Sequence, residues 1–571
     1  MKHFWTMALL LVLSACGKRP PASLTIATIN DFHGSLYEQS TRQQGQVAGG
    51  LPWLAGTLDA WRAEGTPLIL LDGGDVFQGT WPVNATRGMG AVEAFNLLGV
   101  DAGAVGNHEF DYGGGEPGEH PLRGALENAG LQARWAWLSA NIVDSSTGQP
   151  WGPEGFQATT IIERGGLRIG VIGLTTTDTP ETTLLKNVAD LRFTDPVVAV
   201  KHHAERLRAE RADLIAVVGH LSGSCPKRGK ATDPCVPDGE IGRLLTELPP
   251  GTMDLLVTGH AHTTMAFRHD DTLVLQSGSK GRSIGRVDLV FDNGNILWEN
   301  TRVRAPVYLV HSPTEPGCAG GTFDTTPLRI DEWTVTPNQE ALALIERLEA
   351  KTGSLCTPAG CTAVAMPRNR NGGSVLGSTV ADAMRAAFPD ADLAVTNAGG
   401  LRADLPKGQV LREHLHGVMP FDNRLVLVEM TGAKLSRLLE IGTSGAHGPL
   451  QLSGGSVSIH TEEVLARDLN GDGAQDEWET NRVCGAVVDG KPIEAESKYT
   501  VITTDFLLGG GDHLTPAFEG ARKLADGPLL RDHLIQWFTH QDSCVDAAPD
   551  AMRRLITNEC PKSPAQETET R

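Results

Sequence analysis

Seven side chains in the first half of the chain have the right chemistry to bind two divalent cations together. They lie in short segments where an apolar run leads into Asp, Asn or His, and they offer oxygen and imidazole ligands without a thiolate. Such a mixed set suits Zn, Mn, Fe or Mg and does not choose among them. A pair of cations of this kind is suited to hydrolysing a phosphate ester. The candidate ligands are Asp31, His33, Asp75, Asn107, His220, His260 and His262, with His108 as an additional histidine.

The spacing of these residues supports a shared site. Asp31 and His33 are two residues apart at the end of an apolar run, so both side chains can point the same way. Asp75 follows Gly73-Gly74, and glycines let the backbone come close to a metal. The two carboxylate oxygens of Asp75 can bridge two cations. The pair His202-His203 lacks this context and is expected to face solvent.

The elements that must position these residues are strands in a layered α/β domain over residues 24–304. Their apolar runs are continuous, as in strands covered on both faces. Five of the six runs end at or near a candidate ligand, and loops after such strands commonly build a site. The predicted strands are Leu24–Asn30, Leu68–Leu71, Ala102–Val105, Leu167–Leu174, Leu214–Val218 and Asp254–Thr258.

A second domain is predicted over residues 355–560, starting with a helix near Leu376 to Phe388. Residues 305–354 read as a connecting stretch that includes a linking helix, because apolar residues recur at helical spacing between Glu340 and Lys351. The polar residues 561–571 are expected to be a disordered tail.

Residues 1–16 are excluded from the fold, because a weakly basic start and a short apolar run end in Leu-Ser-Ala-Cys16. This resembles a bacterial lipoprotein signal, with Cys16 lipidated and residues 17–23 as a tether. Gly17 after the cysteine resembles the pattern of an outer-membrane destination. The alternative is an ordinary signal peptide cleaved nearby. Both predict an exported protein, in the periplasm or at the cell surface, and the first predicts membrane contact only through the lipid.

Of the nine cysteines, eight remain once Cys16 is set aside, and in an exported protein they are expected to be oxidised. Close spacing suggests Cys225–Cys235, Cys356–Cys361 and Cys544–Cys560, which leaves Cys318–Cys484. A composition of 40% hydrophobic and 21% charged residues is that of a globular protein. The net charge of -20 argues against a nucleic-acid polymer as partner, but bound cations would still allow a small anionic substrate.

Several motifs resemble those of the calcineurin-like metallophosphoesterases: Asp31-Phe-His33-Gly, Gly-Gly-Asp75, Gly-Asn107-His108-Glu-Phe-Asp111, Gly-His220 and Gly-His260-Ala-His262. With its second domain, the chain resembles the bacterial 5'-nucleotidase family in particular. This resemblance implies a layered αββα metallophosphoesterase domain joined by a helix to a mixed α/β substrate-binding domain. It also implies two metal sites that share Asp75. Asp31, His33 and His262 would complete the first site, and Asn107, His220 and His260 the second. His262 has a glutamine counterpart in some relatives.

His108 resembles the family's catalytic histidine, with Asp111 as its orienting carboxylate. A histidine beside the metals can stabilise phosphoryl charge or protonate the leaving group. The alternative is that His108 only bonds a loop carbonyl.

The second domain carries a set of residues that resembles the family's nucleotide site. Arg402 and Arg370 would bind phosphate through their planar guanidinium groups, although the surroundings of Arg370 depart from the family pattern. Two phenylalanines would stack on a base, unless they are ordinary core residues. Asn423 would contact the base edge and Asp512 the ribose hydroxyls, while Asn397 belongs to the same motif as Arg402 or caps a turn. The substrate-binding candidates are Arg370, Asn397, Arg402, Phe421, Asn423, Phe506 and Asp512.

A further segment fits an EF-hand-type calcium loop, with side-chain oxygens at Asp468, Asn470, Asp472, Asp476 and Glu479 and a backbone carbonyl at Ala474. Its role would be structural. A solvated acidic loop is the alternative.

The sequence therefore predicts an exported dimetal phosphohydrolase that removes the 5'-phosphate from nucleotides by metal-hydroxide attack, with no protein partner implied. One rival is a 2',3'-cyclic-nucleotide 2'-phosphodiesterase with 3'-nucleotidase activity, and another is a nucleoside-diphosphate-sugar hydrolase. A rival of another class is a metal-bearing surface lipoprotein that binds nucleotides without turnover.

Overall fold

The computed structural model describes residues 21–557, apart from 42, 44, 114–121, 226–228, 313–324, 354, 370, 445–447, 461–464, 467, 470, 472, 475–478 and 549–553. Cys16 and residues 561–571 lie outside this range. Among the described residues, no helix combines the length and the apolar character needed to cross a bilayer.

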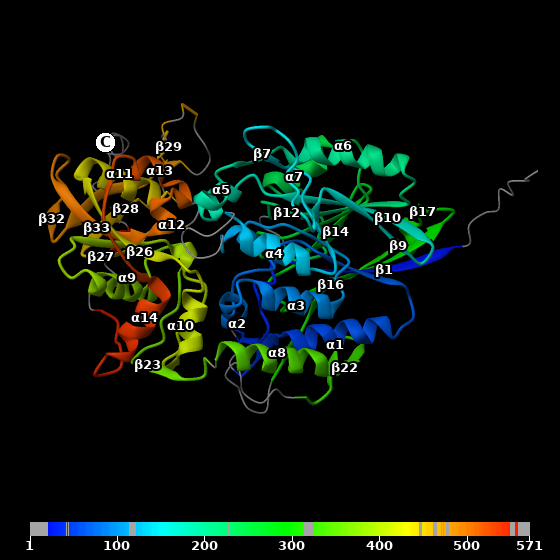
Figure 1. The fold of residues 1–571 in the computed structure, drawn as a ribbon, viewed down its shortest axis with the longest axis horizontal. Coiled ribbons are helices and arrows are strands. Elements are labelled where there is room, and N and C mark those ends of the chain that lie inside the picture. Colours follow the sequence, from blue (N-terminus) through cyan, green and yellow to red (C-terminus); the bar gives the residue numbers. More distant parts are fainter. Residues whose placement is uncertain are drawn as a thin grey trace, which may run out of the picture.

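Two sheets form the centre of the first part of the chain (Figure 1). The strand order of the first sheet is β17-β16-β1-β4-β5-β6-β8, with β18 and β19 also paired to β16. Its strands are β1 (Ala22–Ile29), β4 (Leu68–Asp72), β5 (Ala102–Ala104), β6 (Ala136–Leu138), β8 (Phe156–Gln157), β16 (Ser283–Asp292), β17 (Asn295–Ile296), β18 (Arg302–Val303) and β19 (Val307–Tyr308). Strands β1, β4, β5, β6 and β8 run parallel, so their carboxyl ends meet at one edge.

The second sheet has the order β14-β15-β13-β12-β10-β9, and β10, β12, β13 and β15 are parallel. Its strands are β9 (Thr159–Arg164), β10 (Leu167–Thr175), β12 (Leu214–His220), β13 (Leu255–Thr258), β14 (Thr264–His269) and β15 (Thr272–Ser277). Each of the six strands predicted from apolar runs is present, with ends that differ by at most two residues.

The apolar side chains of the two sheets meet in a buried layer that includes Ile26, Leu71, Val171, Val218 and Val257. Helices cover the outer faces. Those against the first sheet are α1 (Leu51–Arg62), α3 (Met89–Leu98), α4 (Gly124–Gln132) and α8 (Gln339–Thr352), and those against the second are α6 (Pro196–Ala209) and α7 (Gly239–Glu247). The four layers account for strands that are apolar on both faces.

Helix α8 is the predicted linking helix, and it buries Leu344, Ile345 and Leu348 against the first part of the chain. In Figure 1 it lies beside α1. The short helix α2 (Trp81–Ala85) lies at the end of α8, where Trp81 Nε1 donates to the Thr352 carbonyl at 3.0 Å.

The second part is built on a five-stranded sheet of order β27-β24-β33-β26-β34 and a four-stranded sheet of order β32-β31-β28-β35. The strands are β24 (Leu393–Thr396), β26 (Arg424–Thr431), β27 (Gln451–Ser453), β28 (Gly455–Ile459), β31 (Val483–Val488), β32 (Lys491–Pro492), β33 (Lys498–Thr504), β34 (Arg522–Leu529) and β35 (Leu555–Thr557). The helices are α9 (Val375–Ala387), α10 (Arg412–Val418), α11 (Gly432–Gly442), α12 (Asp505–Leu508), α13 (Thr515–Phe518) and α14 (Leu530–Thr539).

Two of the predicted disulfide pairs are wrong. Cys361 pairs with Cys544, which excludes both Cys356–Cys361 and Cys544–Cys560. The reason is a strand contact between residues remote in sequence. Cys361 lies in β23 (Pro358–Thr362), and its carbonyl accepts from the N–H of Val545, the residue after Cys544, at 2.8 Å. This contact brings the Cα atoms of Cys361 and Cys544 to 4.6 Å from each other. The Cys225–Cys235 pair is confirmed, whereas Cys318 and Cys560 lie outside the described residues.

Candidate metal centre

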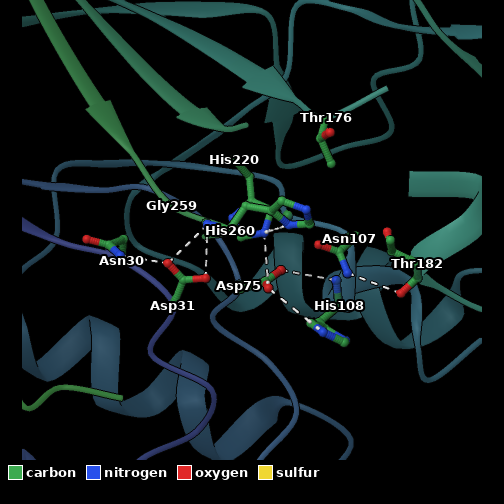
Figure 2. A network of polar contacts seen from close by, with 12 residues as sticks. Asn30, Asp31, Asp75, Asn107, His108, Thr176, Thr182, His220, Gly259 and His260 are labelled. Atoms are coloured by element: carbon green, nitrogen blue, oxygen red, sulfur yellow. Dashed lines mark hydrogen bonds and ion pairs between the residues drawn. The ribbon is translucent and has the colours of Figure 1, made fainter. Parts of the chain in front are cut away.

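The predicted ligands converge where the carboxyl ends of strands from both sheets meet. Asp31 and His33 follow β1, Asp75 follows β4, and Asn107 follows β5 in the first sheet. His220 ends β12, and His260 and His262 follow β13 in the second. Figure 2 shows side chains from the two sheets turned toward one another around Asp75. The pairing of the two sheets, rather than any single loop, brings these residues together.

One cluster contains Asp31, His33 and His262. His262 Nε2 lies 3.2 Å from Asp31 Oδ1 and 3.0 Å from His33 Nε2. Candidate ligand atoms of all three residues lie within 4.8 Å of one another, which is the spacing expected around one ion.

Asp75 lies at the centre of the remaining ligands. Its Oδ2 is 3.1 Å from His220 Nε2 and 3.7 Å from His33 Nε2, so it faces both the first cluster and the remaining ligands. His260 Nδ1 is 3.2 Å from His220 Nε2. Asp31, Asp75 and His220 form another compact group. This placement is the one that a bridging carboxylate requires.

Five of the seven predicted ligands have a left-handed backbone, at Asp31 (φ 49°), His33 (φ 50°), Asp75 (φ 59°), His260 (φ 79°) and His262 (φ 55°). Such conformations are uncommon for residues with a Cβ, and they persist where the surrounding structure holds them in place. Close packing adds to this constraint, since a Cβ at Gly106 would lie 2.2 Å from Asp75 Oδ1. The loops are thus held in shapes that aim side chains at one point.

Neighbouring groups fix the ligand orientation. His33 Nδ1 donates to the Gln78 carbonyl at 3.2 Å and His220 Nδ1 to the Gly73 carbonyl at 3.0 Å, which turns each Nε2 toward the other candidate ligands. Asn107 Nδ2 donates to the Thr182 carbonyl at 3.2 Å (Figure 2). Its Oδ1 is buried without a hydrogen-bond partner among the described residues. A buried carbonyl oxygen without a hydrogen-bond partner in the described part of the chain, next in sequence to His108, fits a metal ligand.

The electrostatics of the site favour positive charge. Burial alone would raise the pKa of Asp75, but His220, His108 and His33 together outweigh it and hold this pKa well below the usual range. Burial acts against a charged His220, yet the carboxylate of Asp75 raises its pKa to about 10. A cation held between these carboxylates would take over the role of that proton, so the residues present fit divalent metal binding.

His108 and Asp111 form the predicted dyad, with His108 Nδ1 2.6 Å from Asp111 Oδ2. His108 Nε2 lies 4.0 Å from Asp75 Oδ2, so the ring faces the metal cluster. Burial lowers the pKa of His108, but Asp111 and Asp75 outweigh it and raise this pKa above its ordinary value. Asp111 fixes the tautomer in which Nε2 faces the site.

Two positioning residues escaped the sequence analysis. Glu109 is buried, and its carboxylate accepts from the N–H groups of Gly106 (2.6 Å), Asp75 (3.1 Å), Val76 (2.8 Å) and Phe77 (2.9 Å). It therefore joins the loop after β4 to the loop after β5. Asn30 Nδ2 donates to Asp31 Oδ2 at 2.6 Å. Each directly adjoins a predicted residue, and this adjacency is the only signal that the sequence offered.

Residues of the second part reach the metal cluster. The Phe421 ring lies 5.7 Å from the ring of His108, centroid to centroid, and the Arg402 guanidinium lies 5.8 Å from the Phe421 ring. Burial lowers the pKa of His33 and of His262, and the positive charge of Arg402 lowers both further. Arg402 therefore lies close enough to His33 and His262 for its charge to act on both.

The other substrate candidates lie on neighbouring loops. Asn397 Nδ2 donates to Asp512 Oδ2 at 2.7 Å, which brings these two predicted residues together. Phe506 lies in α12, where its ring occupies the space above Gly511, and Asn423 is buried beside the start of α14. Arg370 lies outside the described residues.

The calcium-loop prediction falls partly outside the described residues, since Asn470, Asp472 and Asp476 are among those left out. Asp468 accepts from the N–H groups of Gly471 and Gly473, and the buried Glu479 accepts from that of Leu469 at 2.8 Å. The structure also describes Ala474, which is exposed. Occupancy by calcium stays a prediction.

Comparison with known proteins identifies similar chains. Residues 352–520 match the family model of the 5'-nucleotidase C-terminal domain. The chain is 26% identical to the endonuclease YhcR of Bacillus subtilis; the match covers 85% of this chain but only 37% of that protein. It is also 26% identical to a 5'-nucleotidase of Vibrio vulnificus, and this match covers 96% of this chain and 97% of that one. A crystal structure of a 5'-nucleotidase precursor from Thermus thermophilus superposes with a TM-score of 0.74 at 24% identity, over 94% of this chain and all of that one. This likeness confirms the predicted fold class.

Proposed function

We propose that this chain, which belongs to the bacterial 5'-nucleotidase family by its C-terminal domain and its fold, hydrolyses the 5'-phosphate ester of nucleotides with the help of two divalent cations. The observation that carries the proposal is the contact between Phe421 and His108. A candidate base-stacking ring in contact with the candidate catalytic histidine, within the length of a nucleotide, supports the proposal. The domain division at residues 304 and 355 is part of this proposal.

In this proposal Asp31, His33 and His262 would hold one cation, Asn107, His220 and His260 would hold the other, and Asp75 would be shared by both. When bound, the cations supply Lewis-acid activation of water and of the phosphate ester. Asn30, Glu109 and the left-handed loops keep the ligands in place before substrate arrives.

His108 acts on the phosphoryl group or on the leaving oxygen. Its Nδ1 is held by Asp111, so Nε2 is free to donate a proton toward the metal cluster. Donation at this point would stabilise the charge that builds on the phosphoryl oxygens or protonate the ribose 5'-oxygen as it leaves.

Substrate recognition falls to the second part. Arg402, with Arg370, would bind phosphate oxygens, and Phe421 and Phe506 would hold the base between them. Asp512 would accept from a ribose hydroxyl and Asn423 would bond the base edge. The Asn397–Asp512 hydrogen bond supports an orienting role for Asn397.

We also propose that the protein is exported and anchored through a lipid on Cys16. The Cys225–Cys235 and Cys361–Cys544 disulfides support an oxidising compartment. A structural calcium ion at residues 468–479 belongs to the same set of proposals.

The test is phosphate release by the purified protein from AMP, 3'-AMP and 2',3'-cyclic AMP, with and without a chelator, compared with the His108→Ala variant. We expect AMP to be the best of these substrates, with activity lost on chelation and strongly reduced in the variant. Preference for the cyclic or 3' substrate would point to the phosphodiesterase and 3'-nucleotidase rival. In a parallel assay that follows UMP, faster cleavage of UDP-glucose to UMP and glucose 1-phosphate than hydrolysis of AMP would point to a nucleoside-diphosphate-sugar hydrolase. A metal-loaded wild type that binds AMP but releases no phosphate would identify a binding protein.

A further inference from the structure

Three successive residues beside the metal centre contact three different parts of the proposed active site. Thr183 Oγ1 donates to Asp111 Oδ1 at 2.8 Å. The Thr182 carbonyl accepts from Asn107 Nδ2 at 3.2 Å. Glu181 Oε2 lies 2.5 Å from Nδ1 of His513, in the second part of the chain. Residues 181–183 cover the end of the short helix α5 (Thr179–Thr182) and the residue after it, and Figure 2 shows Thr182 facing Asn107.

The Thr183 contact fixes the dyad carboxylate. Asp111 presents Oδ2 to His108 and Oδ1 to Thr183, so a hydrogen bond holds each of its oxygens. Rotation of the carboxylate would break both bonds. Thr183 is buried, so water does not readily replace its hydroxyl. The buried Asn187 supports the same loop by donating from Nδ2 to the Phe110 carbonyl at 2.6 Å.

The contact between Glu181 and His513 depends on the position of the second part. His513 directly follows Asp512, the candidate ribose ligand, and both residues have left-handed backbones (φ 63° and 55°). The carboxylates around His513 are those of Glu181, Asp512 and Asp178. Because Glu181 and His513 come from opposite sides of the domain boundary, their contact requires the second part to lie against α5, as it does here.

We propose that residues 181–183 are a positioning segment that conveys the docking of the second part, sensed by Glu181 at His513, to the His108–Asp111 dyad through Thr183. Thr183 is a positioning residue, because it acts on His108 through Asp111. The inference rests on the proposed function and adds to it a link between the contact of the second part with α5 and the alignment of the dyad.

The first test compares Thr183→Val with Thr183→Ser on AMP and on 4-nitrophenyl phosphate, which has no base to engage the second part. Loss of one hydrogen bond to a charged group predicts a fall in kcat of about 10-fold for Thr183→Val on both substrates. We expect KM to change less than about twofold on the same reasoning, and Thr183→Ser to restore kcat. Thr246→Val is the matched control, because the hydroxyl of this exposed residue donates to the Gly242 carbonyl within α7, outside the proposed active site.

The second test addresses the coupling. Glu181→Gln should lower kcat on AMP by a few-fold and leave 4-nitrophenyl phosphate unaffected. Glu181→Gln should have no additional effect on kcat in the Thr183→Val background, since both substitutions would act through the same positioning segment. Additive losses on AMP, or equal losses on both substrates, would overturn the coupling.

A third measurement does not depend on turnover. In protein labelled with ¹⁵N-histidine, the Nδ1–H resonance of His108 should shift in Thr183→Val and not in Thr246→Val. An unchanged resonance together with an unchanged kcat would overturn the role of Thr183. A wild type that hydrolyses 4-nitrophenyl phosphate but not AMP would refute the proposed function and still allow this test.

Discussion

Asn107 and Thr182 form a hydrogen bond that determines which way the Asn107 amide faces. Nδ2 donates to the Thr182 carbonyl at 3.2 Å, and Oδ1 is thereby turned into the site, where it is buried without a partner among the described residues. An amide held in this way offers a neutral oxygen to a cation, whereas a carboxylate in the same place would face the Thr182 carbonyl with a like partial charge.

Asn107→Asp should therefore weaken binding of one of the two cations. We expect at least about a 10-fold rise in one dissociation constant, since misoriented ligands and lost supporting bonds typically cost 10–100-fold. Isothermal titration with Mn²⁺ or Zn²⁺ measures this. Asn96→Asp is the matched control, because Asn96 Nδ2 also donates to a carbonyl, that of Gln132, at an exposed position. Equal affinities in both variants and the wild type would show that Asn107 is not a ligand.

Glu109→Gln should destabilise the fold around the metal site even without metal. The carboxylate accepts four backbone N–H groups, and an amide would turn an N–H₂ group toward some of them. The free energy of unfolding should fall by about 1–3 kcal/mol, as expected for buried groups left unsatisfied. Urea denaturation of the chelator-treated protein provides the measurement, with the exposed Glu154→Gln as control. A variant as stable as this control would contradict the role given to Glu109.

His416 should make the protein less stable in acid. Burial, with the charges of Arg531 and Arg412, lowers the pKa of His416 to about 3, and its ring packs 4.7 Å from that of Trp81. In the unfolded chain the pKa returns to 6.5, so between these values the unfolded state binds the extra proton and stability falls as pH falls.

Relative to His416→Gln, the wild type should lose up to about 1.4 kcal/mol of unfolding free energy per pH unit below 6.5. Denaturant titrations at pH 7.5, 6 and 5 check this, since the comparison cancels groups that titrate in both proteins. His202→Gln, at an exposed position, should run parallel to the wild type. Parallel curves for His416→Gln as well would contradict the prediction.

Phe421→Ala should separate nucleotide binding from phosphate chemistry. Loss of a stacking contact worth roughly 1–3 kcal/mol predicts a rise in KM for AMP of about 5- to 150-fold. The KM for 4-nitrophenyl phosphate should stay near the wild-type value. A similar loss for both substrates would mean that the ring supports His108, its neighbour at 5.7 Å, instead of a base.

The sequence was sufficient to predict the strands and the side chains that gather at their carboxyl ends, because apolar runs ending in Asp, His or Asn indicate both at once. The approach of Asp31 to His262 depends on two sheets packing together, which the local pattern does not specify. The left-handed backbone at Asp31 and His33 could not be predicted from the sequence either, since neither residue type requires this conformation.

Contacts between distant segments account for the other differences. Thr183 carries no signal of its own, because its importance comes from Asp111, which lies far away in the sequence. The Cys361–Cys544 bond joins segments separated by 183 residues through a strand contact, whereas pairing by proximity in sequence assumed short loops.

The central claim is that Asp75 bridges two cations, and metal stoichiometry tests it most directly. Wild type and Asp75→Ala would be dialysed to equilibrium against Mn²⁺ or Zn²⁺ and analysed for bound metal per chain. A second sample of each protein, dialysed without added metal, would show whether calcium stays bound at the calcium loop. The account predicts two exchangeable ions in the wild type and at most one weakly held ion in the variant. Equal metal content in the two proteins, or a wild type that hydrolyses AMP with no bound metal, would contradict it.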